Sequence, residues 1–406
     1  MASGLILGIE SSCDETAAAV VERGSLTRSS IVASQIGTHA PYGGVVPELA
    51  SREHLRNIVP ITRAALEQAG CELKDIEAVA VTSGPGLAGA LLVGLTYAKT
   101  LAFSLGVPLI SVNHLEGHIH AVLLAENRDQ GSGTREQGIA SGLPMPALAL
   151  VVSGGHTHLF LARPPEGIAA GQAGWRYELI GRTLDDAAGE AYDKVAKLLG
   201  LGYPGGPWID NLAQYGNAKA VPFTFAQIKP KAHLEGKAPR TKGATIAPIG
   251  GLNRHFLFSF SGIKTAVLRY VEVHGMRAAC EERMKTLSAM PHAAWQDALP
   301  WCDKQTLDLI ASFQHAVVGD LMKKTFAAAE AVGAASVLVT GGVAANRELR
   351  VRFTAEAAER GLPIAFPTLA LSTDNAAMIA AAAWPRFVAG EFADWDLEAN
   401  PRMVLA

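Results

Sequence analysis

This chain contains little cysteine, few aromatic residues and almost no net charge. Of its 406 residues, 4 are cysteine and 6% are aromatic, and the formal net charge at pH 7 is −3. The cysteines lie far apart and form no CxxC pair: Cys13, Cys71, Cys280 and Cys302. This pattern argues against a zinc ribbon or a disulfide scaffold and favours a reducing compartment. The small net charge supplies no global field for nucleic acid, so an RNA site needs a local basic patch.

Several sequence signatures are also missing. Glycine, lysine or histidine interrupts each apolar stretch before it reaches the roughly 18 residues of a membrane helix. The N-terminus has no basic region ahead of its first apolar run, so we expect a cytoplasmic protein without signal peptide or membrane segment. Neither G-x-x-x-x-G-K-[ST] nor G-x-S-x-G occurs, which argues against a P-loop NTPase and against a nucleophile elbow.

The chain does contain a large apolar fraction and many glycines. Hydrophobic residues make up 49%, charged residues 18%, and 41 residues are glycine. The length suits two domains, and the glycines suit an α/β protein with tight turns. Three apolar runs end in glycine or small hydroxyl residues, within residues 5–16, 148–158 and 337–346. Backbone N–H groups at such turns can hold phosphate, so the three turns predict a cleft built around a nucleotide.

One strand pattern occurs twice. Residues 4–10 and 17–22 are predicted to form two strands around a turn, and residues 147–153 and 157–162 repeat this layout. We interpret the repeat as an internal duplication; two unrelated hairpins are the alternative. Further helices are predicted over residues 48–68, 84–103, 114–124, 184–199, 307–332, 346–360 and 375–384, and strands over 76–82, 108–112 and 336–339. This alternation predicts mixed sheets with helices on both faces.

A pair of histidines suggests a metal site. His114 and His118 are four residues apart and share one face of a predicted helix, whereas Glu116 points away from that face. The glutamate position differs from the H-E-x-x-H pattern of zinc proteases, and two histidines without a metal are the alternative. Asp374, near the start of the last predicted helix, is a candidate third ligand; helix capping is its alternative role. Two imidazoles and one carboxylate leave coordination positions open and suit Zn²⁺ or Fe²⁺.

Two glycine pairs are candidates for nucleotide binding. Gly154 and Gly155 allow a phosphate to approach the backbone closely, with a plain hairpin turn as the alternative. Gly341 and Gly342 are followed by Asn346 at a predicted helix start. This arrangement fits a loop that faces a nucleoside, with helix capping as the alternative role of the asparagine.

An acidic helix and a basic segment add further candidates. Asp186, Glu190 and Asp193 share one helical face, which is either solvated or a ligand wall where Asp193 binds a ribose hydroxyl or an amine. The following turn places Gly206 and Asp210 nearby. A basic stripe either tracks a phosphate backbone or keeps a surface loop soluble: Lys229, Lys231, Lys237, Arg240 and Lys242.

Together these motifs resemble one known family. The matching segments are GIESSCDET from Gly8, GVVPELASREH from Gly44, TSGPGL from Thr82, NHLEGH from Asn113, VSGGHT from Val152, DDAAGEA from Asp185, FSFSGIK from Phe258, TGGVAAN from Thr340 and STDN from Ser372. Over nearly its whole length the chain is similar to the universal tRNA threonylcarbamoyladenosine transferases of the bacterial type.

The resemblance implies an α/β, two-lobed actin-like ATPase fold of the sugar kinase and Hsp70 type, with duplicated mixed-sheet lobes. Residues 1–145 would form the N-terminal lobe, on which the region 375–406 packs back, and residues 146–374 the C-terminal lobe. Compared with the compact bacterial pattern, the chain is extended near residues 125–145, 163–176, 221–255 and 276–305.

The resemblance also implies an activity. The threonylcarbamoyl group of threonylcarbamoyl-AMP would be transferred to N6 of the adenosine 3′ of the anticodon, in tRNAs reading codons that begin with A, with release of AMP. His114, His118 and Asp374 would hold one divalent metal ion, Fe²⁺ or Zn²⁺. The substrate site would comprise Val151, Val152, Ser153, Gly154, Gly155, Asp193, Gly206, Asp210 and Asn346. Glu15, in the first turn, is the candidate to orient the amine or take its proton.

The implied partners are tRNA, threonylcarbamoyl-AMP, a smaller paralogous actin-like protein and a separate small ATPase. Two other functions stay open at this stage. An actin-like ATPase can serve as a regulatory or binding module without covalent transfer. The paired histidines also invite a metalloprotease hypothesis, against which the missing H-E-x-x-H glutamate counts.

Overall fold

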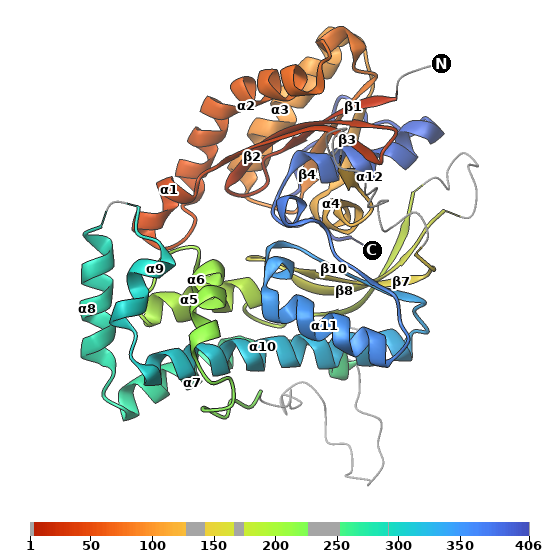
Figure 1. Cartoon of the computed structure of the whole chain (residues 1–406). Coiled ribbons are helices and arrows are strands. Elements are labelled where there is room, and N and C mark those ends of the chain that lie inside the picture. The colour runs from red at the N-terminus through yellow and green to blue at the C-terminus, as the bar shows by residue number, and fades with distance from the viewer. Residues whose placement is uncertain (1–3, 127–142, 166–173, 226–251, 291, 406) are drawn as a thin grey trace, which may run out of the picture.

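The computed structural model describes residues 4–126, 143–165, 174–225, 252–290 and 292–405, and it consists of two lobes that lie one above the other (Figure 1). Each lobe is built on one mixed β-sheet. The first sheet has the strand order β5-β4-β1-β2-β3-β6 and the second the order β11-β10-β7-β8-β9.

The strands of the first sheet are β1 (Leu5–Glu10), β2 (Glu15–Glu22), β3 (Leu26–Ser34), β4 (Ala78–Gly84), β5 (Leu109–Asn113) and β6 (Ala125–Glu126). Those of the second are β7 (Ala147–Val152), β8 (Thr157–Arg163), β9 (Arg176–Arg182), β10 (Ser336–Thr340) and β11 (Ile364–Ala365). The α-helices are α1 (Ile36–His39), α2 (Pro47–Ala69), α3 (Ala88–Leu105), α4 (His114–Ala121), α5 (Ala188–Leu198), α6 (Gly205–Leu212), α7 (Ser261–Val273), α8 (Arg277–Ser288), α9 (Trp295–Ala298), α10 (Lys304–Ala331), α11 (Arg347–Glu359) and α12 (Ala376–Ala389).

The two sheets repeat one topology. In the first, β1 pairs antiparallel with β2 and parallel with β4, and β4 pairs parallel with β5. In the second, β7 pairs antiparallel with β8 and parallel with β10, and β10 pairs parallel with β11. Both hairpins that the sequence predicted are therefore present, and each leads a sheet of the same strand order. The predicted duplication of mixed-sheet lobes is confirmed.

Side chains along β1 alternate between the two faces of the first sheet, and both faces are covered by helices. Leu7 and Ile9 of β1 pack toward α2 and α3, whereas Ile6 packs toward α12 on the other face. Gly8 lets α12 come close, because a Cβ there would lie 2.2 Å from the carbonyl oxygen of Ala376. The last long helix of the chain thus covers the first sheet of the protein.

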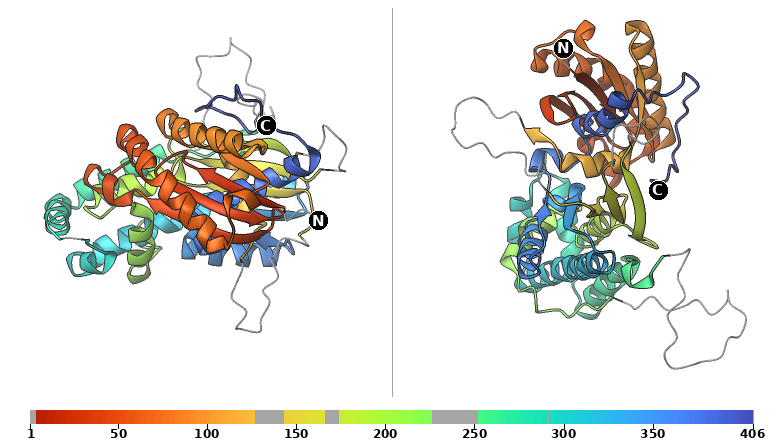
Figure 2. Two further views of the ribbon diagram at one scale, coloured as in Figure 1. Left: turned by 90° about the horizontal axis from the view of Figure 1, so that it is seen from above. Right: turned by 90° about the vertical axis from the view of Figure 1, so that its right-hand side faces the viewer.

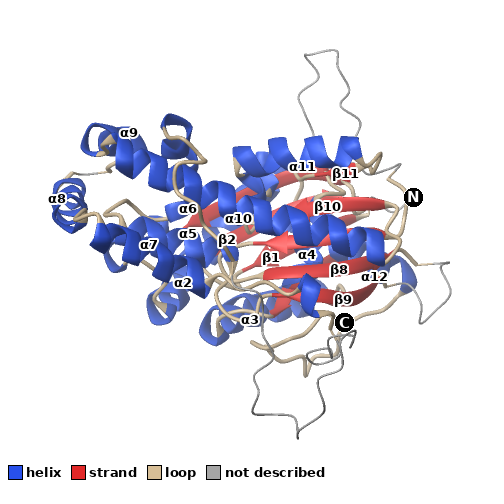
Figure 3. Ribbon diagram, turned by 90° about the horizontal axis from the view of Figure 1, so that it is seen from below, coloured by secondary structure: helices blue, strands red, loops and turns tan. Residues whose placement is uncertain are grey.

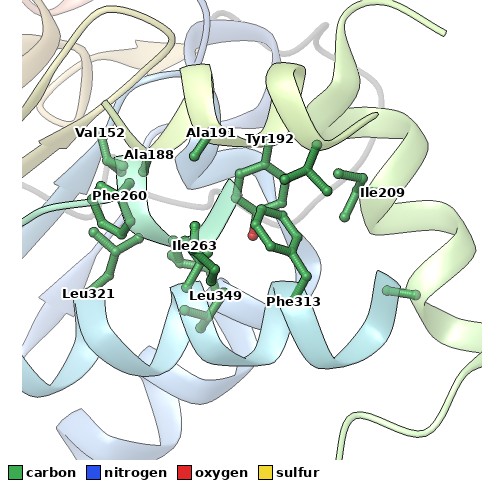
Figure 4. Close-up of a cluster of buried hydrophobic side chains, with 14 of the residues drawn as sticks. Val152, Ala188, Ala191, Tyr192, Ile209, Phe260, Ile263, Phe313, Leu321 and Leu349 are labelled. Carbon is green, nitrogen blue, oxygen red and sulfur yellow. The ribbon is translucent and has the colours of Figure 1, made fainter. Parts of the chain in front are cut away.

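The second sheet has its larger core on the face covered by α5, α10 and α11 (Figure 3). Leu148, Leu150 and Val152 of β7 point into this core, where Tyr192 and Phe313 pack edge to face with ring centroids 5.2 Å apart (Figure 4). The opposite face of β7 packs against Leu115 and Ile119 of α4.

Helix α4 therefore lies between the two sheets. It packs along α12 on one side and contacts β7 and β10 on the other. The hydroxyl of Thr340 in β10 donates a hydrogen bond of 2.7 Å to the carbonyl oxygen of His118. From the upper lobe the C-terminal tail runs down to this junction, where Leu405 is buried in the same cluster (Figure 2).

Some local predictions were wrong. Helix α5 begins at Ala188, four residues later than predicted, because the Asp185 carboxylate accepts hydrogen bonds from Ser259, Phe260 and Ser261 instead of joining the helix. Asp186 consequently does not share a helical face with Glu190 and Asp193. Strands β3 and β9 went unpredicted, since both are partly exposed and carry arginine, serine or glutamate among their apolar residues.

The extensions are only partly within the described residues. The segment near 276–305 contains α8 and α9, so its mixed composition is helical. The basic stripe from Lys229 to Lys242 lies outside the described residues. The four cysteines are free.

One helix within the described part of the chain, α3, is long and apolar enough to cross a membrane when judged by length and composition alone. Its buried residues face the first sheet, where α3 packs against α2 and β4. A helix at the edge of a folded core passes the same test, so this finding is weak evidence for a membrane span.

Candidate metal and nucleotide site

Three predicted metal ligands meet where α4 approaches the start of α12. The Nε2 atom of His118 lies 3.1 Å from Oδ1 of Asp374, and Nε2 of His114 lies 3.6 Å from the same oxygen. One ligand atom from each of the three residues falls within 4.8 Å of the others. The helix supplies this geometry because its i and i+4 positions share a face.

Helix capping, the alternative role of Asp374, is performed by its neighbour. The side chain of Asn375 accepts a hydrogen bond of 2.9 Å from the backbone N–H of Met378 and caps α12. The capping prediction for Asp374 is therefore wrong, and its carboxylate is directed at the two histidines. Burial opposes ionisation of the Asp374 carboxyl, but the nearby His114 and His118 outweigh it and hold its pKa below its usual range.

The imidazole of His118 provides a test of whether these residues fit a metal. The residue is completely buried, its Nδ1 has no hydrogen-bond partner among the described residues, and its Nε2 meets only Oδ1 of Asp374, at 3.1 Å and without hydrogen-bond geometry. Buried polar atoms without partners are rare in native proteins, and a bound cation would satisfy Nε2. The donor set of two imidazoles and one carboxylate also suits a divalent metal with open positions. The residues present therefore fit such an ion.

His114 is oriented by a carboxylate that sequence reasoning missed. Its Nδ1 lies 3.1 Å from Oε2 of Glu10 and 3.1 Å from the hydroxyl of Ser12, so Nε2 points toward Asp374. A carboxylate behind a ligating histidine is the usual arrangement at protein metal sites. Burial opposes protonation, but Asp374 and Glu10 outweigh it and raise the pKa of His114 to about 9. The sequence signal for this role was a glutamate at the end of the apolar run of β1, a strand that the structure buries completely.

Two glycines allow the backbone to pack closely around the nucleotide-loop candidates in the second lobe. A Cβ at Gly341, whose φ is 94°, would lie 2.4 Å from the carbonyl oxygen of Val152. A Cβ at Gly189 would lie 2.6 Å from the carbonyl oxygen of Ser153. By contrast, a Cβ at Gly154 or Gly155 would meet no described atom within 4 Å. The backbone of that turn is thus open to a ligand.

His156 connects this turn to the metal-ligand cluster. Its ring centroid lies 6.0 Å from that of His114. Its backbone N–H donates a hydrogen bond of 3.2 Å to the Ser153 hydroxyl. Burial, together with the charge on His114, lowers the pKa of His156 to about 3, so this imidazole is neutral. We did not predict this residue from the sequence, although it directly follows Gly155.

The remaining substrate-site candidates are partly engaged with neighbouring residues. Oδ1 of Asp193 accepts a hydrogen bond of 2.7 Å from Gly205 N, at the start of α6. Asp210 pairs with Arg347 at 3.0 Å, and Asn346 caps α11 by accepting from Leu349 N. Asn346 therefore caps a helix, which was its alternative role. Contact between Asn346 and a ligand remains a prediction. A Cβ at Gly206 would meet no described atom within 4 Å.

The first turn of the chain faces the second lobe. Glu15 begins β2, and its pKa is raised well above the usual carboxyl range by burial and by the nearby Asp374 and Asp14. The charge of Asp14 also acts on Asp193 and on Tyr203, which belong to the second lobe. Glu15 is thus near Asp374 of the metal-ligand cluster, and its neighbour Asp14 is near Asp193.

Asp193 gives a prediction for stability. Burial, opposed by the hydrogen bond from Gly205 and aided by Asp14 and Glu190, raises its pKa to about 6 from an ordinary 3.8. Its native state therefore binds a proton more tightly than the unfolded chain does, and this contribution to stability is lost as the pH rises through 6. The wild type should therefore lose about 1.4 kcal/mol of unfolding free energy between pH 5 and pH 8 that Asp193→Asn does not lose. Urea unfolding of both proteins at the two pH values measures it; a pH-independent difference would contradict it.

Comparison with known proteins identifies the family. The signature of the family described as "TsaD: tRNA N6-adenosine threonylcarbamoyltransferase" matches residues 27–381. This chain belongs to that family. It is 58% identical over 405 residues to the tRNA N6-adenosine threonylcarbamoyltransferase of Koribacter versatilis (strain Ellin345), with 100% of both chains covered. A TsaD-family protein of the same description from Symbiobacterium thermophilum is 47% identical, covering 100% of this chain and 98% of that protein. The resemblance inferred from the motifs is confirmed.

Solved structures support the fold. HypF from T. kodakarensis aligns with a TM-score of 0.50 and 14% sequence identity, covering 96% of this chain and 48% of that one. At such identity the likeness concerns the fold alone. The TsaD-family chain has the predicted two-lobed, actin-like ATPase type of fold.

Proposed function

We infer that this chain transfers the threonylcarbamoyl group from threonylcarbamoyl-AMP to N6 of the adenosine 3′ of the anticodon in tRNAs that read codons beginning with A. Membership of the TsaD family supports the activity. The observation that carries the site assignment is the meeting of His114, His118 and Asp374 beside the turn that holds His156. We propose that these three residues hold one divalent ion, Fe²⁺ or Zn²⁺.

The acyl donor is a mixed anhydride with a good leaving group, so positioning contributes more than strong acid catalysis. A divalent ion bound there would supply a Lewis acid for the donor oxygens. The open backbone at Gly154 and Gly155 is proposed to hold the AMP phosphate, together with Val151, Val152 and Ser153. Asp193, Gly206, Asp210 and Asn346 are proposed to line the nucleoside. The tRNA adenine must leave its stack to present its amine.

Glu15 is proposed to orient that amine or to accept its proton as the C–N bond forms and AMP departs. Its place at the start of β2 and its raised pKa, which increases the affinity of the carboxylate for a proton, fit a general base. Glu15→Gln should lower kcat by about 10²- to 10⁴-fold with little change in KM. Glu22→Gln, at the other end of the same strand, is the matched control. A Glu15→Gln enzyme with wild-type kcat would remove Glu15 from the mechanism.

One assay tests the activity itself. The protein is incubated with threonine, bicarbonate, ATP, tRNA and extract lacking this protein, and the tRNA is digested to nucleosides. A threonylcarbamoyl-adenosine peak that depends on the added chain is the expected result. If the chain hydrolyses ATP but the peak never forms, the protein is a regulatory or binding module of the actin-like type instead.

Partners, setting and lobe boundaries are proposed on the same basis. We propose that a smaller paralogous actin-like protein and a separate small ATPase act with this chain, in the cytoplasm and without a membrane. We propose residues 1–145 as one lobe, with 375–406 packing on it, and 146–374 as the other. The packing of α12 on β1 and β2 supports this division.

A further inference from the structure

The side of α4 that faces away from the metal-ligand cluster carries a buried ion pair. Both carboxylate oxygens of Glu116 accept from Nη2 of Arg386, at 3.1 and 2.9 Å. Glu116 is 1% exposed and comes two residues after His114 and two before His118. Arg386 lies in the last turn of α12, whereas Asp374 directly precedes the cap of that helix. The ion pair and the ligand cluster thus join the same two elements at opposite ends of α12.

A second contact lies between these two points. A Cβ at Gly117 would be 2.8 Å from Cδ1 of Ile379 and 3.2 Å from Cγ of Met378, so α4 rests directly on the body of α12. On the outer side, the Tyr177 hydroxyl from β9 lies 3.4 Å from Oε1 of Glu116 and 3.0 Å from Nε2 of His120. Glu116 is therefore held from both lobes.

These contacts oppose rotation of α4 about its own axis. Side-chain tips lie about 5–6 Å from a helix axis, so a 20° rotation would move a ligand atom by about 2 Å. Metal ligands tolerate about 0.2 Å. All eight residues of α4 are buried, so the ion pair acts together with the apolar packing of Leu115 and Ile119 in resisting such a rotation.

We propose that Glu116 and Arg386 are positioning residues that fix the rotation of α4, and through it the distance of the His114 and His118 ligand atoms from Asp374. The proposal rests on the metal role put forward above for those three residues. It predicts that the ion pair affects metal affinity and not only stability, because the pair acts on ligand geometry.

The test is Zn²⁺ binding to full-length apoprotein, measured by competition with a chromophoric chelator well below the unfolding temperature. Glu116→Gln and Arg386→Gln should each raise the Zn²⁺ Kd by about 10- to 100-fold, the loss typical of residues that orient metal ligands. The double variant should lose no more Zn²⁺ affinity than the single variant with the larger loss, since both changes break the same interaction. Arg386→Lys keeps the charge and should recover part of the affinity.

A second buried ion pair supplies the matched control. Asp320 and Lys324 lie 2.7 Å apart within α10, remote from α4, with side chains 10% and 18% exposed. Asp320→Asn should lower stability without changing the Zn²⁺ Kd. The proposal is overturned if the folded Glu116 and Arg386 variants bind Zn²⁺ within twofold of the wild type while His114→Ala, His118→Ala loses it. If that histidine variant binds Zn²⁺ like the wild type, the metal role and the positioning role both fail. Should the glutamine variants not fold, Tyr177→Phe, which removes the hydroxyl that contacts Glu116 from β9, decides by the same twofold criterion.

Discussion

Replacing both helical histidines, His114→Ala with His118→Ala, should abolish metal binding at this site and lower the transfer rate by about 10²- to 10³-fold. Loss of one electrostatic stabiliser of a transition state typically costs that much. The physical reason lies in the donor set: the carboxylate of Asp374 alone cannot replace two imidazoles that converge on it at 3.6 and 3.1 Å. Metal analysis of protein purified without chelator and the nucleoside assay measure the two effects.

The control for this variant removes two histidines far from the site. His255 and His274 are exposed and lie in η5 (Arg254–Phe256) and at the end of α7. His255→Ala with His274→Ala should retain metal and activity. A His114, His118 double variant that stays folded, lacks metal and still transfers at the wild-type rate would refute the metal role. Circular dichroism and a thermal melt establish folding in each case.

The second large effect concerns the open turn between β7 and β8. Gly155→Val should weaken AMP binding by about 10- to 100-fold, because a branched side chain would occupy the space in which a phosphate meets the backbone N–H groups. Hydrogen bonds to a charged group contribute about 1.5–3 kcal/mol each. Stability should change little, since the new Cβ meets no described atom within 4 Å and Gly155 does not adopt a positive φ.

Isothermal titration with AMP measures this effect, and Gly262→Val is the matched control. A Cβ at Gly262 also meets no described atom within 4 Å, but this residue lies at the start of α7. The control should bind AMP normally. Unchanged AMP affinity in both Gly155→Val and Gly154→Val would place the phosphate elsewhere.

Local patterns in the sequence were sufficient to predict most helices and the leading strands. The two hairpins, the long helix α10 and the i, i+4 pair of histidines all follow from periodicity and turn residues, which depend on neighbours along the chain. The site motifs were recognisable for the same reason, as each is a continuous segment. The start of α5 was not predictable in this way, because Asp185 bonds to Ser259 and Ser261, more than seventy residues away.

The sequence by itself determined the two repeated strand patterns, the family and the types of side chain available to a metal. Only the tertiary structure removed helix capping from the alternative roles of Asp374, because Asn375 caps the helix and leaves that carboxylate beside the histidines. It also brought Glu10 behind His114 and Arg386 against Glu116. These contacts join residues 104 and 270 positions apart, and their partners are chosen by the packing of α4 and α12 on the sheets, which no local pattern encodes.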